Sequence, residues 1–191
     1  MNNDTFKKAK MFNNKASRKK SKANKVIDII KIMKGNKIAD IGSGGGYFTI
    51  RFAKLVGDEG HIYAIDTNSE FLKYIKLQAD KNDLKNITTI QADDDKPKLP
   101  KEKLDYIFLR NVYHHIPNRL KYLQILGEGL RKDGKIIIIE HNGSGYLNFN
   151  KLFGHYIKPE IIKKEMKKVG YIIDEEHYFI TQQSFTIFKI R

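Results

Sequence analysis

The chain of 191 residues contains no cysteine. This absence excludes disulfide bonds, a thiolate nucleophile and any zinc site with cysteine ligands. The sequence also lacks an apolar run of the roughly 20 residues that a membrane-spanning helix needs, and its basic start lacks the apolar segment of a secretory signal. We therefore expect a protein without a transmembrane segment that works in the cytoplasm.

The composition is that of a globular protein, with 40% hydrophobic and 30% charged residues. The net charge of +14 is uneven, because residues 1–25 hold nine lysines and arginines against one acid. We interpret residues 1–25 as a basic, partly disordered arm and residues 26–191 as the folded domain. Such an arm can bind nucleic acid or an anionic membrane. A solubilising role is favoured, because aromatic residues for base stacking are not interleaved with the charges.

A glycine-rich turn organises the first half of the domain. The apolar run Ile38 to Ile41 precedes four glycines within five residues, and apolar residues at helical spacing follow. This pattern predicts a buried parallel strand, a tight turn and a helix start. Glycine permits the backbone angles of such a turn, and the helix start offers free N–H groups to a ligand. The spacing is D-x-G-x-G-x-G from Asp40 to Gly46, which is neither a dinucleotide fingerprint nor a Walker loop.

This stretch resembles motif I of the class I S-adenosylmethionine-dependent methyltransferases, which wraps the methionine end and the ribose of the cofactor. The residues by themselves are also compatible with an alternative, a glycine-rich turn in an α/β domain that binds no ligand. The resemblance implies that S-adenosyl-L-methionine is the cofactor and that the loop residues binding it are Asp40, Gly42, Ser43, Gly44, Gly46 and Tyr47.

Three acidic residues further along extend the resemblance. Asp66 ends the second predicted strand about twenty residues after the glycine turn, where a carboxylate can accept both ribose hydroxyl hydrogens. The resemblance assigns it that role, with Thr67 beside the adenine, although Asp66 could instead cap the next helix. After the third strand, residues 87–90, the resemblance assigns the adenine amino group to Asp93, with Asp94 as its substitute. A solvated acidic turn is the alternative.

The fourth predicted strand, residues 104–109, leads into the segment R-N-V-Y-H-H-I-P. It resembles the N-V-x-H-H-I segment of small-molecule methyltransferases related to ubiquinone- and menaquinone-biosynthesis enzymes. The resemblance implies that backbone at Arg110 and Asn111 contacts the methionine ammonium and that His114 or His115 faces the acceptor. A histidine can remove a proton from the acceptor. Much of the rate of methyl transfer should come from in-line placement of the nucleophile and the sulfonium methyl group. Two structural histidines are the alternative.

The sequence lacks the residues that several other classes of methyltransferase require. There is no Asn/Asp-Pro-Pro-aromatic tetrad for nucleobase amines, no Lys-Asp-Lys-Glu tetrad for ribose hydroxyls, and no cysteine for cytosine C5 or arsenite methylation. The residues after strands four and five, Arg110-Asn111 and Glu140-His141-Asn142, do not support a magnesium site, which needs carboxylates after both strands. We expect no metal, although a histidine site is conceivable among four residues on loops at one rim, His114, His115, His141 and His155.

The resemblance covers residues 26–191. It implies an α/β fold with a Rossmann-like, doubly wound, seven-stranded sheet of order 3-2-1-4-5-7-6, in which strand 7 is antiparallel. Residues 140–158 are interpreted as an aromatic lid over the acceptor, or else as an ordinary connection.

The predicted reaction is methyl transfer to an O, N or C nucleophile of a small molecule. The alternatives are an RNA or protein methyltransferase that uses the basic arm, and a binding module for S-adenosylmethionine without catalysis.

Overall fold

The computed structural model describes residues 3–101, 103–144 and 154–191. Its strands are β1 (Lys37–Ile41), β2 (His61–Asp66), β3 (Ile87–Gln91), β4 (Leu104–Arg110), β5 (Leu130–His141), β6 (Tyr171–His177) and β7 (Gln183–Ile190). They follow the order β3-β2-β1-β4-β5-β7-β6. β7 is antiparallel to β5 and β6, so the predicted sheet order and the antiparallel last strand are confirmed. No helix in these ranges is long and apolar enough to span a bilayer.

The chain divides into two compact units, Met1–Asp93 and Asp94–Arg191. The first contains α1 (Asn3–Ser17), η1 (Lys19–Ser21), α2 (Ala23–Ile30), α3 (Tyr47–Val56) and α4 (Ser69–Lys81) with β1 to β3. β2 pairs in parallel with β1 and with β3, which places Ile62 opposite Ile38 and Ile87. Four of the five residues of β1 are buried, as expected for a strand that is covered on both faces.

Helix α1 was not predicted from the sequence. Ala9 is fully buried against α4, and two edge-on aromatic pairs flank it, Phe6 with Tyr74 at 5.0 Å and Phe12 with Phe71 at 5.6 Å between ring centroids. These positions are three apart, the spacing of one helix face. Residues 3–17 are therefore helical in the structure, where a partly disordered arm was expected. The division of the chain after residue 25 stays a prediction.

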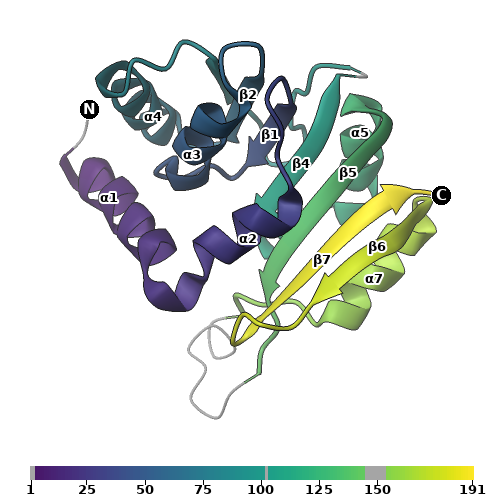
Figure 1. The fold of residues 1–191 in the computed structure, drawn as a ribbon. Helices are drawn as coiled ribbons and strands as arrows, with labels where there is room; N and C mark the ends of the chain where they lie inside the picture. Colours follow the sequence, from purple (N-terminus) through teal and green to yellow (C-terminus); the bar gives the residue numbers. More distant parts are fainter. Residues whose placement is uncertain (1–2, 102, 145–153) are drawn as a thin grey trace. The chain divides into compact units, whose positions relative to one another are not determined.

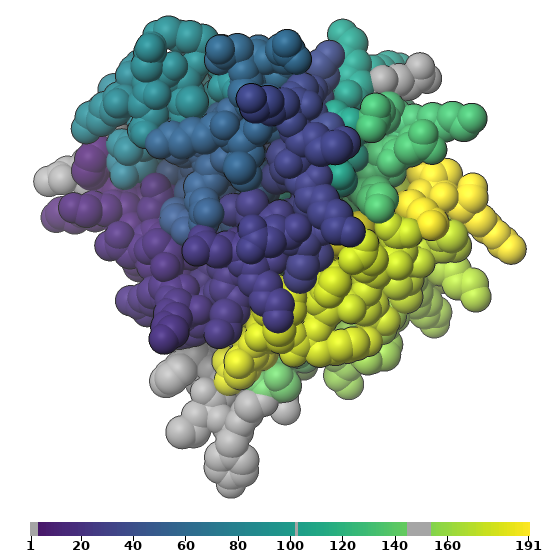
Figure 2. Space-filling model, viewed as in Figure 1, coloured from purple at the N-terminus to yellow at the C-terminus, as the bar shows by residue number. Residues whose placement is uncertain are grey.

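The lysines of α1 lie outside its buried face. Lys7, Lys8 and Lys10 are exposed, and the helix is drawn in purple along the surface of this unit in Figure 2. The helix was not predicted because its apolar face has only a few residues, which stand among many charged ones in the sequence.

The second unit holds β4 to β7 with η2 (Tyr113–His115), α5 (Arg119–Gly129) and α7 (Pro159–Lys168). Within it, β5 lies between β4 and β7, and β6 is the edge strand (Figure 1). Ile136 to Ile139 of β5 are all buried. The pairing of β4 with β5 moves from Leu104↔Leu130 to Tyr106↔Lys135, so residues 131–134 form an irregular start to β5.

A charged cluster ties η2 to α7 within this unit. Tyr113 is fully buried, and its hydroxyl donates to Glu165 Oε2 at 2.7 Å. Arg119 donates to both oxygens of the same carboxylate, at 2.8 and 2.9 Å. Two parallel hydrogen bonds of this kind fix the geometry of an arginine–carboxylate pair. The position of η2, and of the histidines that follow Tyr113, therefore depends on α7.

Candidate active site

The glycine turn between β1 and α3 has the backbone that its sequence predicts. Gly42, Gly44 and Gly46 have φ values of 67°, 52° and 78°, a region that side chains disfavour. The Gly42 and Ser43 N–H groups both donate to the Ile65 carbonyl oxygen, at 2.8 and 3.1 Å. Gly46 is the N-cap of α3, and a Cβ there would lie 2.6 Å from Ile75 Cγ1. Glycine is therefore required both by conformation and by space.

Asp66 joins the end of β2 to this turn. Its Oδ2 accepts a hydrogen bond from Gly44 N at 2.8 Å, and its Oδ1 accepts one from Asn68 N at 2.9 Å. Burial raises the pKa of Asp66, and hydrogen bonds from the Asn68, Gly44 and Thr67 backbone act in the opposite direction. The N-cap of α4 is Asn68, whose side chain accepts from two backbone N–H groups. Asp66 is therefore not the helix cap, which was the alternative to ribose binding.

Asp40 points to α3 within the same unit. It is 4% exposed, and its Oδ2 accepts a hydrogen bond from Thr49 Oγ1 at 2.6 Å. Burial raises the pKa of Asp40 to about 7, the Thr49 hydrogen bond opposes this shift, and the nearby charge of Asp66 adds to it. Asp40 thus connects β1 to α3, and its predicted contact with the cofactor stays a prediction.

The other residues that were predicted to bind the cofactor have contacts outside the glycine turn or are exposed. Tyr47 begins α3 and its hydroxyl accepts from Arg51 at 3.1 Å. The Thr67 carbonyl accepts from Gln91 Nε2 at 3.3 Å. Asp93 ends this unit with an exposed side chain, and the Ala92 N–H beside it donates to the Asp66 carbonyl oxygen at 3.1 Å. The adenine role of Asp93 stays a prediction, as does that of Asp94, which is also exposed.

Helix α1 lies directly against the glycine turn. Asn13 Nδ2 donates to the Gly45 carbonyl at 2.8 Å. A Cβ on Gly45 would lie 2.3 Å from both the Ala9 carbonyl oxygen and Asn13 Oδ1. Sequence reasoning missed this contact, because Asn13 and Gly45 are 32 residues apart and nothing in either local pattern points to the other.

In the second unit, Gln183 of β7 contacts the last residue of β4 and the residue that follows it. Arg110 Nη2 donates to Gln183 Oε1 at 3.2 Å, and Gln183 Nε2 donates to Asn111 Oδ1. Asn111 has a φ of 55°, and its N–H donates to the Ile139 carbonyl at 2.8 Å. A left-handed residue that is not glycine is uncommon and here marks the sharp turn at the strand end. Gln183 was missed because it is 72 residues from Asn111.

His114 sits on a buried carboxylate. Glu140, at the end of β5, is 0% exposed, and its Oε2 lies 3.0 Å from His114 Nδ1 and accepts from His114 N at 3.2 Å. The Nδ1–Oε2 contact is short but not aligned as a hydrogen bond, and Nδ1 has no aligned partner. The other oxygen, Oε1, accepts from His141 N at 2.8 Å. The sequence offered one signal for Glu140, a charge directly after four isoleucines at the end of a buried strand.

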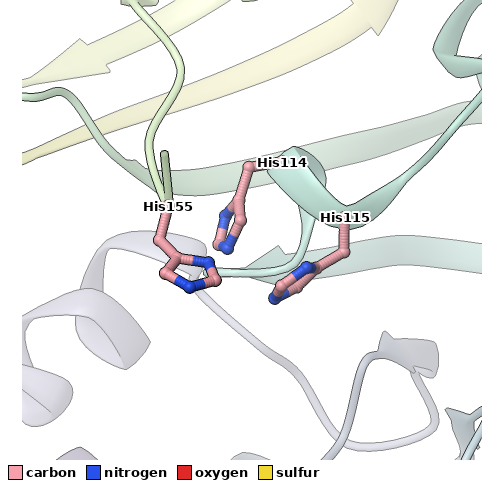
Figure 3. A group of neighbouring side chains, drawn as sticks. All are labelled: His114, His115 and His155. Carbon is pink, nitrogen blue, oxygen red and sulfur yellow. The ribbon is translucent and has the colours of Figure 1, made fainter. Parts of the chain in front are cut away.

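Three imidazole rings meet beside this carboxylate. His114 and His115 have ring centroids 4.0 Å apart, and His155 lies 5.3 Å from the first ring and 5.5 Å from the second. Figure 3 shows the three side chains turned toward one another, two from η2 and one from the segment before α7. Burial lowers the pKa of His115, and the charges of His114 and His155 lower it further.

The predicted aromatic lid is only partly described. Residues 145–153, with Tyr146, Phe149 and Phe153, lie outside the described residues. At the described ends, Ile157 N donates to the His141 carbonyl at 3.0 Å. A Cβ on Gly143 would lie 2.4 Å from the Tyr156 ring.

Comparison with known proteins agrees with this geometry. The family model described as a methyltransferase domain matches residues 32–186. A ubiquinone/menaquinone biosynthesis C-methyltransferase UbiE from Azotobacter vinelandii is 24% identical over 131 residues, which cover 68% of this chain and 52% of that protein. The UbiE protein from Teredinibacter turnerae is 29% identical over 115 residues, covering 60% of this chain and 46% of that protein. The chain thus spans about half the length of these relatives.

A solved structure shows the same fold. The crystal structure of a SAM-dependent methyltransferase from Aquifex aeolicus superposes with a TM-score of 0.80 at 21% identity, covering 88% of this chain and 89% of that one. The family match extends over most of the chain, and the sheet order agrees with the expectation from the sequence. The resemblance to class I S-adenosylmethionine-dependent methyltransferases is therefore confirmed, and the chain belongs to the methyltransferase-domain family.

Proposed function

We propose that the protein transfers a methyl group from S-adenosylmethionine to a nucleophilic O, N or C atom of a small molecule. The observation that carries the proposal is Asp66, a half-buried carboxylate at the end of β2 that is held by the backbone N–H groups of Gly44 and Asn68. The relatives named as ubiquinone/menaquinone C-methyltransferases support a small-molecule acceptor. When bound, the cofactor would supply an electrophilic methyl group on a sulfonium sulfur.

The residues of the first unit fit such a cofactor. A carboxylate offers about four lone-pair positions. Backbone N–H groups of Gly44, Asn68 and Thr67 occupy three of those of Asp66, so one remains for a ribose hydroxyl. Gly42, Gly44 and Gly46 leave the main chain of the turn without a Cβ, and α3 begins directly after them. Free N–H groups at that helix start favour polar and anionic ligand groups.

On the acceptor side, the proposal assigns His114 and His115. An O–H or N–H acceptor must release its proton as the new bond to the methyl carbon forms, while the sulfur keeps the electron pair of the broken bond. These histidines assist that release, and Glu140 positions His114 from behind. Arg110 and Asn111 are proposed to present backbone to the methionine end, where Gln183 holds both side chains.

The test is calorimetry with S-adenosylmethionine on the wild-type protein and on two Asp66 variants. Asp66→Ala should weaken binding at least about 10-fold, because hydrogen bonds to a charged group contribute about 1.5–3 kcal/mol each. Asp66→Asn keeps an acceptor for Gly44 N and should bind with intermediate affinity. Asp83→Ala, an exposed acid of the same unit, is the matched control. Circular dichroism must show that each variant is folded.

Undiminished affinity in Asp66→Ala would refute the ribose assignment. A second experiment follows transfer from cofactor with a labelled methyl group to a panel of small molecules, to RNA and to protein. Label in RNA or protein alone would contradict a small-molecule acceptor. Cofactor binding without transfer to any acceptor would favour the binding module that was weighed from the sequence.

A further inference from the structure

The histidine cluster in the second unit has the composition of a metal site. His114, His115 and His155 each offer one ring nitrogen, and these nitrogens lie within 4.8 Å of one another. His114 is nearly buried at its side chain, whereas His115 and His155 are exposed. Figure 3 shows the three rings gathered beside one another, with ring nitrogens of each facing the other two.

Glu140 provides the second observation. A histidine that binds a metal commonly gives its other ring N–H to a carboxylate, which fixes the tautomer and the ring orientation. Glu140 Oε2 lies 3.0 Å from His114 Nδ1, and backbone N–H groups of His114 and His141 hold the carboxylate in place. A proton on Nδ1 leaves the lone pair of His114 on Nε2, free to bind a metal. A small rotation of the ring would align the contact with Glu140.

The ligand set selects the kind of metal. Three imidazole nitrogens suit Zn²⁺ and other late transition metals, whereas Mg²⁺ and Ca²⁺ require oxygen ligands. Zn–N bonds of about 2.0–2.1 Å place tetrahedral ligands about 3.3 Å apart. The nitrogens here are at most 4.8 Å apart, so they must approach by up to about 1.5 Å. Torsion of the exposed His115 and His155 side chains can provide this without moving β4 or β5.

We propose that His114, His115 and His155 bind one Zn²⁺ ion and leave its fourth coordination position open. This departs from the expectation, drawn from the sequence, that the chain holds no metal. Three histidines with an open position are typical of catalytic zinc sites, in contrast to structural sites with four protein ligands.

The open position suggests a class of acceptor, an inference that rests on the proposed methyl transfer. A hydroxyl or enol oxygen bound there loses its proton at a lower pH, because the ion stabilises the negative charge. That proton would pass to solvent, and the oxygen or its conjugated carbon would bond to the methyl carbon. The bond from that carbon to sulfur would break with its electron pair remaining on sulfur, and the ion would be unchanged at the end. The histidines would then assist proton release through the ion, because a nitrogen that binds metal has no lone pair for a proton.

The test is calorimetric titration of the full chain with ZnCl₂, after removal of metal with a chelator and without S-adenosylmethionine. We expect one ion per chain, and at least about 100-fold weaker binding in His115→Ala and His155→Ala. Both side chains are exposed, so these variants should fold. The matched control is His61→Ala, a histidine of the first unit whose Nε2 contacts Thr88 Oγ1 at 2.8 Å, and it should bind Zn²⁺ as the wild type does.

Two further readouts sharpen the result. Co²⁺ in place of Zn²⁺ should give the intense visible absorption of a tetrahedral site in the wild type and lose it in His155→Ala. Glu140→Gln should weaken Zn²⁺ binding about 10- to 100-fold, as expected for a positioning residue. No binding of one ion per chain, or binding that His155→Ala leaves unchanged, would overturn the proposal. Cofactor affinity of the metal-free protein is measured separately, so failure of the zinc site and failure of cofactor binding are distinguishable.

Discussion

Asp40→Asn should remove a pH-dependent loss of stability from this fold. The ordinary pKa of an aspartate is 3.8, and burial raises the pKa of Asp40 to about 7. Between these two pKa values, the folded chain keeps a proton on Asp40 that the unfolded chain has already released. Folded protein therefore binds more protons, and its free energy of unfolding must fall as the pH rises from about 4 to about 7.

The magnitude follows from the two pKa values. At about 1.4 kcal/mol for each pKa unit, the interval from 3.8 to about 7 corresponds to about 4 kcal/mol at full ionisation. Between pH 5 and pH 8 the same linkage gives a change of about 2–3 kcal/mol. Asp40→Asn carries no charge at either pH, and its amide oxygen can still accept the hydrogen bond from Thr49. Relative to the wild type, the variant should gain about 2–3 kcal/mol over this interval.

Urea unfolding at pH 5, 6, 7 and 8 measures this difference. Subtracting wild type from variant removes the titration of other groups, including His61, His115 and His141, whose pKa values burial lowers. A difference that stays constant within about 0.5 kcal/mol from pH 5 to pH 8 would refute the reasoning. Thr49→Val is the matched control with the opposite sign. It removes the donor that favours the ionised carboxylate, so it should destabilise the protein more at pH 8 than at pH 5.

Three other substitutions test the packing that supports the two sites, each by chemical denaturation. Gly45→Ala should destabilise the protein by about 1–3 kcal/mol, because its Cβ would meet Asn13 and the α1 backbone at 2.3 Å; an unchanged midpoint would contradict the docking of α1. Tyr113→Phe should cost about 1.5–3 kcal/mol through the lost hydrogen bond to Glu165, whereas a loss below about 0.5 kcal/mol would mean that this hydroxyl contributes little. Asn86→Ala should cost about 2–4 kcal/mol, since the side chain donates to two carbonyl oxygens, one in α3 and one directly after it; wild-type stability would show that water replaces both contacts.

The two proposed sites depend on different supports. Asp66 and the glycine turn are held by backbone hydrogen bonds over short distances in the first unit. The histidines depend on Glu140 from β5 and on the cluster that ties η2 to α7. Loss of the hydrogen bond between Tyr113 and Glu165 of α7 should therefore disturb metal binding more than cofactor binding. This asymmetry allows the two proposals to be tested independently in one protein.

The local features were determined by the sequence alone. The apolar run before Gly42, the glycines with positive φ and the acid at the end of β2 all stand where residue type and spacing placed them. Each depends on interactions between near neighbours in the chain, such as strand alternation, helix periodicity and turn conformation. The sheet order and the antiparallel last strand followed from resemblance to a family, because no local pattern encodes which strands become neighbours.

Only the tertiary structure decided which distant residues meet. It placed Asn13 on Gly45, Gln183 on Asn111 and Glu140 beneath His114, across 32, 72 and 26 residues of chain. Four histidines were expected on loops at one rim, and the structure joins His155, not His141, to the pair after β4. Such contacts arise when elements pack to bury apolar surface, and the polar groups that meet depend on the register of that packing. The chemistry of the histidine cluster, unlike the glycine turn, is therefore a property of the folded chain.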